Sequence, residues 1–321
     1  MRPFWLQQAL DSAQEAVCPP LQGDTRCDVC IVGGGYTGLW TALMLKEAVP
    51  ALDVVLIEAD ICGAGASGRN GGCALSWSAK YFTLERLFGA AEAVRLVRES
   101  ERSIADIGVF CAANGIDCDY RLDGTLYTAT NAAQVGATDA VIAALEHKGI
   151  NSFRRLPLEQ VQRLAGSGRH LEGWFSPAAA TVQPGKLVRG LRRVALQRGV
   201  RLYEGTAMTG LEHGAPVQVR TAHGTLRADR VVLGLNAWMA RVFPQFERSV
   251  AIVSSDMVIT EPCPELLRQI GLDSGISVLD SRIFVHYYHN TSDGRLMLGK
   301  GGNTFASVSY THLTLPTNRE V

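Results

Sequence analysis

Three apolar segments near the start of the chain follow one another in the order strand, helix, strand. Residues 27–32 and 54–57 are short, mostly apolar runs with the length of a buried strand, whereas the apolar run 39–48 has the length of a helix. Pro50 follows the longer run and cannot continue a helix, because its ring clashes with the preceding turn. The pattern therefore predicts a βαβ unit over residues 27–57.

Apolar spacing along the rest of the chain predicts further elements. Asp123-Gly124, within the stretch 120–127, has the sequence of a tight hairpin turn. The expected helices are a short one before Pro19, a long one over 83–113, and two more over 131–147 and 186–198. The expected strands are 200–203, 217–220, 225–227, 231–233, 250–260 and 283–289.

The turn between the first strand and the following helix is rich in glycine. Gly33, Gly35 and Gly38 have the spacing G-x-G-x-x-G, which permits a tight turn, close approach of a pyrophosphate and close helix–strand packing. Glu58 stands at the end of the second strand, where a carboxylate accepts hydrogen bonds from ribose hydroxyls and repels a 2′-phosphate. Because strand, helix, second strand and terminal acid coincide, the pattern predicts a dinucleotide site and argues against NADP.

A second glycine-rich segment, residues 63–72, follows this acid directly. Its small residues let the backbone lie flat against a bulky ligand, and Ser67, Arg69 and Asn70 add polar groups. The alternative interpretation is a flexible surface loop. We favour ligand binding, because the segment adjoins the predicted ribose site.

Taken together, these motifs resemble the FAD-dependent D-amino-acid-oxidase-type superfamily and, within it, the gamma-glutamylputrescine oxidase-like proteins. The resemblance rests on residues 29–40, 57–58 and 65–72, and it extends more sparsely from residue 4 to about 307. It implies FAD as the cofactor, and it implies an α/β fold in which a Rossmann-like FAD-binding domain carries an inserted α+β substrate domain.

The resemblance also implies which residues bind FAD. The pyrophosphate would lie along Gly33, Gly35, Tyr36, Thr37 and Gly38, and the adenosine ribose would lie on Glu58. The flavin side would be lined by Ser67, Arg69, Asn70, Gly71 and Gly72. The backbone of Met208 would meet the adenine, and the turn at Asn236 and Ala237 would close over the FAD. Catalytic side chains are not identified.

The domain boundaries expected on this basis divide both domains into two segments. The FAD-binding domain would comprise 27–85 and 151–245, and the substrate domain 86–150 and 246–307, after a lead-in over 1–26. Residues 308–321 resemble translated read-through of a sequencing adapter. We therefore expect them to be a non-native tail on a C-terminally truncated chain.

Composition narrows the choice of partners. The 321 residues are 47% hydrophobic, and 31 basic residues balance 31 acidic ones, which favours neither nucleic acid nor an anionic membrane. The sequence contains no secretory h-region and no apolar run of 18 residues, so we expect a cytoplasmic protein without a membrane span. The eight cysteines do not form a disulfide-scaffold pattern, and no Cys/His cluster predicts a metal site.

A cysteine pair, an aromatic run and a basic stripe could each have a chemical role, but we prefer a structural interpretation for all three. Cys27 and Cys30 lie three apart on a strand, so they should point to opposite faces and act as buried structural cysteines rather than as a redox pair. In the run 286–289, one pair of side chains could face the flavin, but we prefer to interpret them as surface or edge-strand aromatics. A solvated helix face is expected for the basic stripe Lys186, Arg189, Arg192, Arg193 and Arg198.

The activity implied by the resemblance is oxidation of the C–N bond of an amine or amino acid, such as a gamma-glutamylputrescine-like compound. Hydride transfer to flavin N5 would give an imine that water hydrolyses, with oxygen as the electron acceptor. Two alternatives stay open: a dehydrogenase that passes electrons to a quinone or carrier, and an inactive truncated FAD-binding fragment. An NAD-dependent dehydrogenase ranks lower, because it would not need the second glycine-rich segment.

Overall fold

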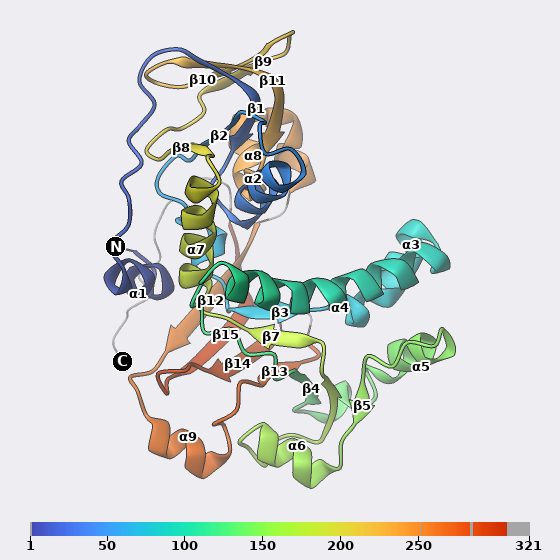
Figure 1. Cartoon of the computed structure of the whole chain (residues 1–321). Helices are drawn as coiled ribbons and strands as arrows, with labels where there is room; N and C mark the ends of the chain where they lie inside the picture. The colour runs from blue at the N-terminus through green and yellow to red at the C-terminus, as the bar shows by residue number, and fades with distance from the viewer. Residues whose placement is uncertain (1, 251, 283–284, 307–321) are drawn as a thin grey trace.

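The computed structural model describes residues 2–250, 252–282 and 285–306, and within them the chain forms two main sheets (Figure 1). The expected tail over 308–321 lies outside the described residues. The first sheet has six strands. In spatial order they are β8 (Arg201–Tyr203), β2 (Val54–Ile57), β1 (Thr25–Val32), β11 (Thr225–Leu233), β10 (Val217–Arg220) and β9 (Gly210–Glu212).

The centre of the first sheet is the predicted βαβ unit. Strand β1 pairs in parallel with both β2 and β11. Ile31 and Leu56 pack on one face beneath helices α2 (Tyr36–Ala48) and α7 (Pro184–Gln197), whereas Val32 packs on the other face with residues of β10 and β11. Because both faces are covered, β2 and residues 29–32 of β1 are apolar and buried throughout, as parallel strands usually are. The structure thus confirms the strands and helix expected over 27–57.

The lead-in begins with a short helix, as expected. Helix α1 (Phe4–Ser12) lies against the N-terminal end of α7, where Gly185 permits the contact. A Cβ atom on Gly185 would stand 2.3 Å from the carbonyl oxygen of Trp5. The contact attaches the start of the chain to the helix that covers the first sheet.

The second sheet has seven strands that come from two separated parts of the chain. In spatial order they are β12 (Ile252–Ile259), β15 (Leu296–Ala306), β14 (His286–Asn290), β13 (Ser277–Asp280), β4 (Thr125–Ala129), β6 (Glu172–Ser176) and β5 (Arg154–Arg155). A short two-stranded ribbon, β3 (Cys73–Leu75) with β7 (Ala179–Thr181), lies between the two sheets in Figure 1.

The expected division at residue 151 does not match the sheets. Strands β5 and β6 follow that position, yet they pair with one another and with β4 in the second sheet. The sequence predicts neither strand, and it places residues 151–245 in the expected FAD-binding domain because no local pattern shows which sheet a segment joins. The other domain boundaries stay predictions.

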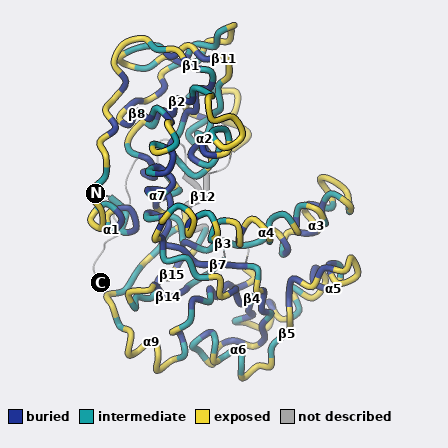
Figure 2. Tube along the Cα trace, viewed as in Figure 1, coloured by how far each residue is buried: buried dark blue, intermediate teal, exposed yellow. Residues whose placement is uncertain are grey.

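The helices outside the first sheet form an arm and short connections. The arm consists of α3 (Tyr81–Phe88) and α4 (Ala90–Ala113), with α5 (Asp139–His147) beside it, and Figure 2 shows that α3 is largely exposed. The remaining α-helices of the described residues are α6 (Leu158–Leu164), α8 (Met239–Val242) and α9 (Pro264–Ile270). No helix of the described residues is long and apolar enough to cross a membrane.

Two local predictions in this region are wrong. The helix expected over 83–113 is interrupted at Gly89, whose φ of +82° is a conformation that ends a helix and suits glycine. The hairpin expected at Asp123-Gly124 does not form, because its two arms take different partners. Arg121 bridges to Thr181, whereas β4 pairs with β6 and β13.

The two cysteines of β1 are buried and free, as expected, but they do not lie on opposite faces. Cys27 and Cys30 belong to the same hydrophobic cluster. The amides of Asp28 and Val29 both donate to the carbonyl oxygen of Asp53, at 3.0 and 3.2 Å. The strand is therefore irregular at Asp28, and the alternation of side chains between the two faces is broken there.

Candidate functional site

The glycine-rich turn after β1 is closely packed against its neighbours. Gly33 has a φ of +114°, and a Cβ atom there would stand 2.5 Å from the carbonyl oxygen of Gly234. A Cβ atom on Gly38 would stand 1.9 Å from the carbonyl oxygen of Gly33, so the first turn of α2 lies directly on the loop. Only glycine fits these positions without a shift of the backbone.

The N-terminal end of α2 is suited to an anion. Its N-cap residue is Gly35, which has no side chain to cap the helix, and no acidic residue lies in its first turn. The helix dipole and the unpaired amides of such an end attract a phosphate. The amide of Tyr36 already donates to the hydroxyl oxygen of Ser67 at 2.9 Å, and the Tyr36 hydroxyl donates to the carbonyl oxygen of Pro184 at 3.0 Å. Thr37 is exposed beside them.

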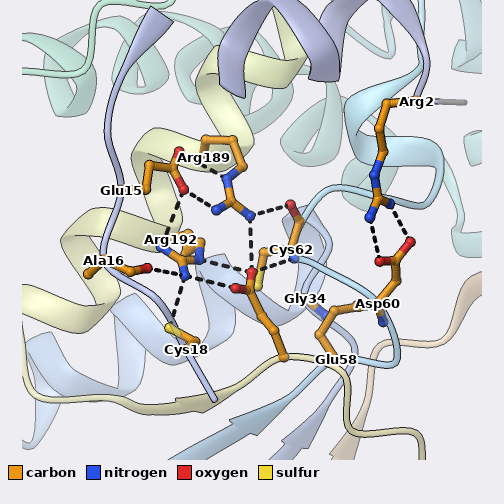
Figure 3. Close-up of polar contacts among 11 residues, drawn as sticks. Arg2, Glu15, Ala16, Cys18, Gly34, Glu58, Asp60, Cys62, Arg189 and Arg192 are labelled. Carbon is orange, nitrogen blue, oxygen red and sulfur yellow. Dashed lines mark hydrogen bonds and ion pairs between the residues drawn. The ribbon is translucent and has the colours of Figure 1, made fainter. Parts of the chain in front are cut away.

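Glu58 stands at the end of β2 and is joined to the same loop. One carboxylate oxygen accepts from the Gly34 amide at 2.7 Å, and the other accepts from the Asp60 amide at 3.0 Å (Figure 3). Burial raises the pKa of the Glu58 carboxyl, and the two amide hydrogen bonds oppose that effect. A carboxylate has about four acceptor positions, so Glu58 can also accept from the hydroxyls of a ribose.

The segment 63–72 is folded by its own polar side chains. The Arg69 guanidinium donates to the carbonyl oxygens of Gly65, at 3.2 Å, and Ala64. The Asn70 side chain donates to the Ser67 carbonyl oxygen at 3.0 Å and accepts from the Gly72 amide at 2.9 Å. These side chains therefore fix the shape of the loop, and they leave its backbone as the surface available to a ligand.

The C-terminal end of this loop touches the second sheet. The Nε2 atom of His289 lies 2.8 Å from the carbonyl oxygen of Gly71. A Cβ atom on Gly71 would stand 2.3 Å from the Tyr287 ring, so the ring lies directly against the loop. The expected edge position is wrong, because β14 lies between β13 and β15 inside the sheet, and the Tyr287 ring is partly covered rather than a free surface group.

The remaining predicted residues follow strands of the first sheet. Met208 comes after β8 and is largely buried in the cluster beneath β10 and β11. Asn236 follows β11 with a φ of +50°, and its side-chain oxygen accepts from the Ala237 amide at 2.7 Å. The Gly234 amide donates to the carbonyl oxygen of Val32 at 2.8 Å, which brings this turn beside the glycine-rich loop.

The basic stripe on α7 is not a solvated face, which corrects the sequence interpretation. The side chains of Arg189 and Arg192 are 6% and 2% exposed. Glu204 accepts from Arg189 at 3.0 Å and from Arg192 at 2.8 Å. Glu15 of the lead-in accepts from both guanidinium groups as well.

This ion-pair network supports the loop beneath the glycine-rich turn. Glu204 accepts from the Cys62 amide at 2.8 Å, and Arg189 donates to the Cys62 carbonyl oxygen at 3.0 Å. A Cβ atom on Gly34 would stand 2.4 Å from the Cys62 sulfur. Sequence reasoning missed these roles, because the acidic partners lie 12 to 177 residues away along the chain.

The residues present fit FAD. The glycine cradle, the uncapped helix end and the free acceptor positions of Glu58 match a pyrophosphate and a ribose, and the backbone surface of 65–72 suits a flat ring. Among the described residues, no group of three or more His, Cys, Asp or Glu side chains could hold a metal ion.

Comparisons with known proteins agree with this arrangement. Residues 28–320 match the family DAO, described as FAD dependent oxidoreductase. Gamma-glutamylputrescine oxidoreductase of Escherichia coli (strain K12) is 33% identical over 277 residues, which are 86% of this chain and 64% of that protein. Probable oxidoreductase OrdL of Rhizobium meliloti (strain 1021) is 32% identical over 89% of this chain and 66% of its own length.

The fold also matches solved structures. Glycine oxidase from Bacillus cereus superposes with a TM-score of 0.68 over 87% of this chain and 71% of its own, at 20% sequence identity. The similarity at this level concerns the fold. The chain spans just under two thirds of the length of the two sequence relatives.

Proposed function

The chain belongs to the DAO family of FAD-dependent oxidoreductases, and from that premise we propose that it oxidises the C–N bond of an amine or amino acid. The name of the Escherichia coli relative favours a gamma-glutamylputrescine-like amine as the substrate. The observation that carries the proposal is the contact of the 65–72 loop with the second sheet through Gly71 and Tyr287. It brings the surface suited to a flat ring against a sheet that can form a substrate site.

In this proposal FAD lies across the carboxyl end of the first sheet. The pyrophosphate rests on residues 33–38, the ribose on Glu58, and the flavin along 65–72, with Met208 and the 236–237 turn beside the adenosine half. The support for this placement is the glycine cradle together with the uncapped end of α2. Ligands of open α/β sheets bind at this end of the strands.

Bound FAD supplies a hydride acceptor for the carbon next to the amine nitrogen. The chain's contribution is to position the amine and to exclude water. Burial raises the pKa of the Tyr287 hydroxyl and lowers the pKa of the His289 imidazole. Both groups are therefore uncharged at neutral pH, so neither the partly exposed Tyr287 ring nor the buried His289 beneath the loop adds a charge beside the proposed flavin position.

Anaerobic reduction tests this function. Protein loaded with FAD is expected to lose its visible flavin absorbance when a primary or secondary amine such as gamma-glutamylputrescine is added without oxygen. Release of hydrogen peroxide in air would identify an oxidase, whereas reduction of an artificial dye without peroxide would identify a dehydrogenase. Intact FAD-loaded protein that no amine or amino acid bleaches would contradict the proposal.

The variant Glu58→Gln is expected to weaken FAD binding roughly tenfold, because hydrogen bonds to a charged acceptor are worth about 1.5–3 kcal/mol and the amide keeps part of the contact. Quenching of FAD fluorescence on titration with apoprotein measures the dissociation constant. Glu159→Gln makes the same chemical change on the exposed face of α6 and is the matched control. Equal FAD affinities for the two variants would show that Glu58 does not contact the cofactor.

A further inference from the structure

His289 is a buried histidine that joins the second sheet to the glycine-rich loop. It lies on β14 and is 2% exposed. Its Nε2 atom is 2.8 Å from the carbonyl oxygen of Gly71, and its Nδ1 atom is 2.7 Å from the carbonyl oxygen of Asn290. Both ring nitrogens thus face hydrogen-bond acceptors.

Only one of the two carbonyl oxygens has another hydrogen-bond donor. The carbonyl oxygen of Asn290 also accepts from the Arg121 guanidinium, which bonds the Asn290 side chain as well, at 2.8 Å. A neutral imidazole carries one N–H group and can donate to one carbonyl only. With the proton on Nε2, His289 donates to Gly71 and Arg121 satisfies Asn290, so the 2.7 Å contact between the bare Nδ1 and the Asn290 carbonyl oxygen is then not a hydrogen bond.

The end of the loop is held from several sides. The Val182 amide donates to the carbonyl oxygen of Gly72 at 2.8 Å, which ties the loop to the chain before α7. The Tyr287 ring packs on Gly71 from β14. The bond from His289 adds a directional contact between the loop and the second sheet, and a directional contact fixes a separation that ring packing alone leaves adjustable.

We propose that His289 is a positioning residue that holds the 65–72 loop against the second sheet through an Nε2–H···O=C bond to Gly71. The inference rests on the proposed function, in which the flavin lies along this loop and the substrate on that sheet. The bond would set the distance between the reacting carbon and the flavin. Distances of this kind influence the rate of the chemical step more than substrate affinity.

Two variants separate the hydrogen bond from the packing of the ring. His289→Leu removes the donor and keeps the bulk, whereas His289→Gln keeps an N–H donor at a comparable reach. Hydrogen–deuterium exchange of the 65–72 amides is expected to be roughly tenfold faster in His289→Leu than in the wild type and near the wild-type rate in His289→Gln. The limiting rate of anaerobic flavin reduction should fall by a similar factor, and kcat in air should fall with it. The substrate concentration that gives half the limiting rate, and KM, should change little.

Tyr288→Phe is the matched control. Tyr288 is on the same strand as His289, and its hydroxyl donates to the Ala165 carbonyl oxygen at 2.6 Å and lies 3.1 Å from His170 Nε2. Its ring packs on the cluster that contains Val161 and Ala165. Loop exchange in Tyr288→Phe should equal that of the wild type. Loop exchange in His289→Leu that matches Tyr288→Phe would overturn the proposal, as would a His289→Gln variant that exchanges as fast as His289→Leu.

A measurement on the unaltered protein covers the case in which His289→Leu does not fold. Nitrogen NMR of the wild-type imidazole is expected to show a proton on Nε2, and a bare Nε2 would overturn the proposal. Neither the exchange rate of the loop amides nor the tautomer of the His289 imidazole depends on catalytic turnover. A wild type with protected loop amides that no amine reduces would therefore contradict the proposed function and leave the role of His289 supported.

Discussion

Replacing Glu204 with alanine is expected to lower the free energy of unfolding by about 3–5 kcal/mol, because it leaves buried guanidinium charge short of a partner. Arg189 and Arg192 are both more than nine-tenths buried, and Glu204 accepts hydrogen bonds from each. Glu15 still reaches both arginines but cannot take the place of the second carboxylate. The variant should also release the Cys62 amide, which Glu204 holds at 2.8 Å.

Urea denaturation followed by circular dichroism measures this loss. Glu212→Ala is the control, because Glu212 pairs with Arg220 at the surface, where side chains are 45% and 59% exposed. Exposed pairs contribute about 0–1 kcal/mol. Similar losses for the two variants would show that the buried network does not stabilise the fold.

The same network gives stability a pH dependence on the acid side. Burial is the largest single influence on the Glu204 carboxyl and disfavours its charged form, but the hydrogen bonds from Arg192 and the Cys62 amide, together with the positive charges of Arg192 and Arg189, outweigh it, and the pKa of Glu204 is lowered. A lowered carboxyl pKa contributes stability above the pKa of the unfolded chain, and that contribution is lost as the pH falls through the folded value. The unfolding free energy of the wild type should therefore fall more steeply below about pH 4.5 than that of Glu204→Gln.

Replacing Gly38 with alanine is expected to weaken FAD binding by roughly 10- to 100-fold. The added methyl group would stand 1.9 Å from the carbonyl oxygen of Gly33, so helix α2 must move away from the loop that receives the pyrophosphate. Overpacking of this kind costs about 1–3 kcal/mol, and each 1.4 kcal/mol changes affinity tenfold. Titration of apoprotein with FAD measures the change.

Gly168→Ala is the matched control for this variant. Gly168 lies in the second-sheet half of the chain, and a Cβ atom there would meet nothing within 4 Å. Its FAD affinity and thermal midpoint should stay near the wild-type values. If Gly38→Ala binds FAD as tightly as Gly168→Ala does, then the close contact between α2 and the turn is not required for the cofactor.

The βαβ unit was predictable because its determinants are local. Strand β2 has the predicted bounds, since four buried residues in a row fit a strand that is covered on both faces. The turn at Gly33 and the acid at Glu58 could be predicted from the same stretch of sequence. All of these features lie within about thirty residues, where spacing and turn chemistry determine the structure.

Other features were not predictable, because their partners are distant along the chain. Arg189 and Arg192 have the spacing of an exposed basic face, and only the fold brings Glu15 and Glu204 to them. Asp123-Gly124 has the sequence of a hairpin turn, yet tertiary pairing sends its two arms to different strands. The contact between His289 and Gly71 joins two segments that no local pattern connects.

The parallel pairing of β1 with β11 has a consequence for biosynthesis. Thr25 is in register with Leu226, so one edge of β1 finds its partner about 200 residues after it has been made. At a synthesis rate of roughly 5–20 residues per second, this edge waits on the order of 10–40 s on the ribosome. An apolar strand with a free edge is prone to aggregate over such an interval. Chaperone supply during translation should therefore limit the soluble yield more than the stability of the finished fold does.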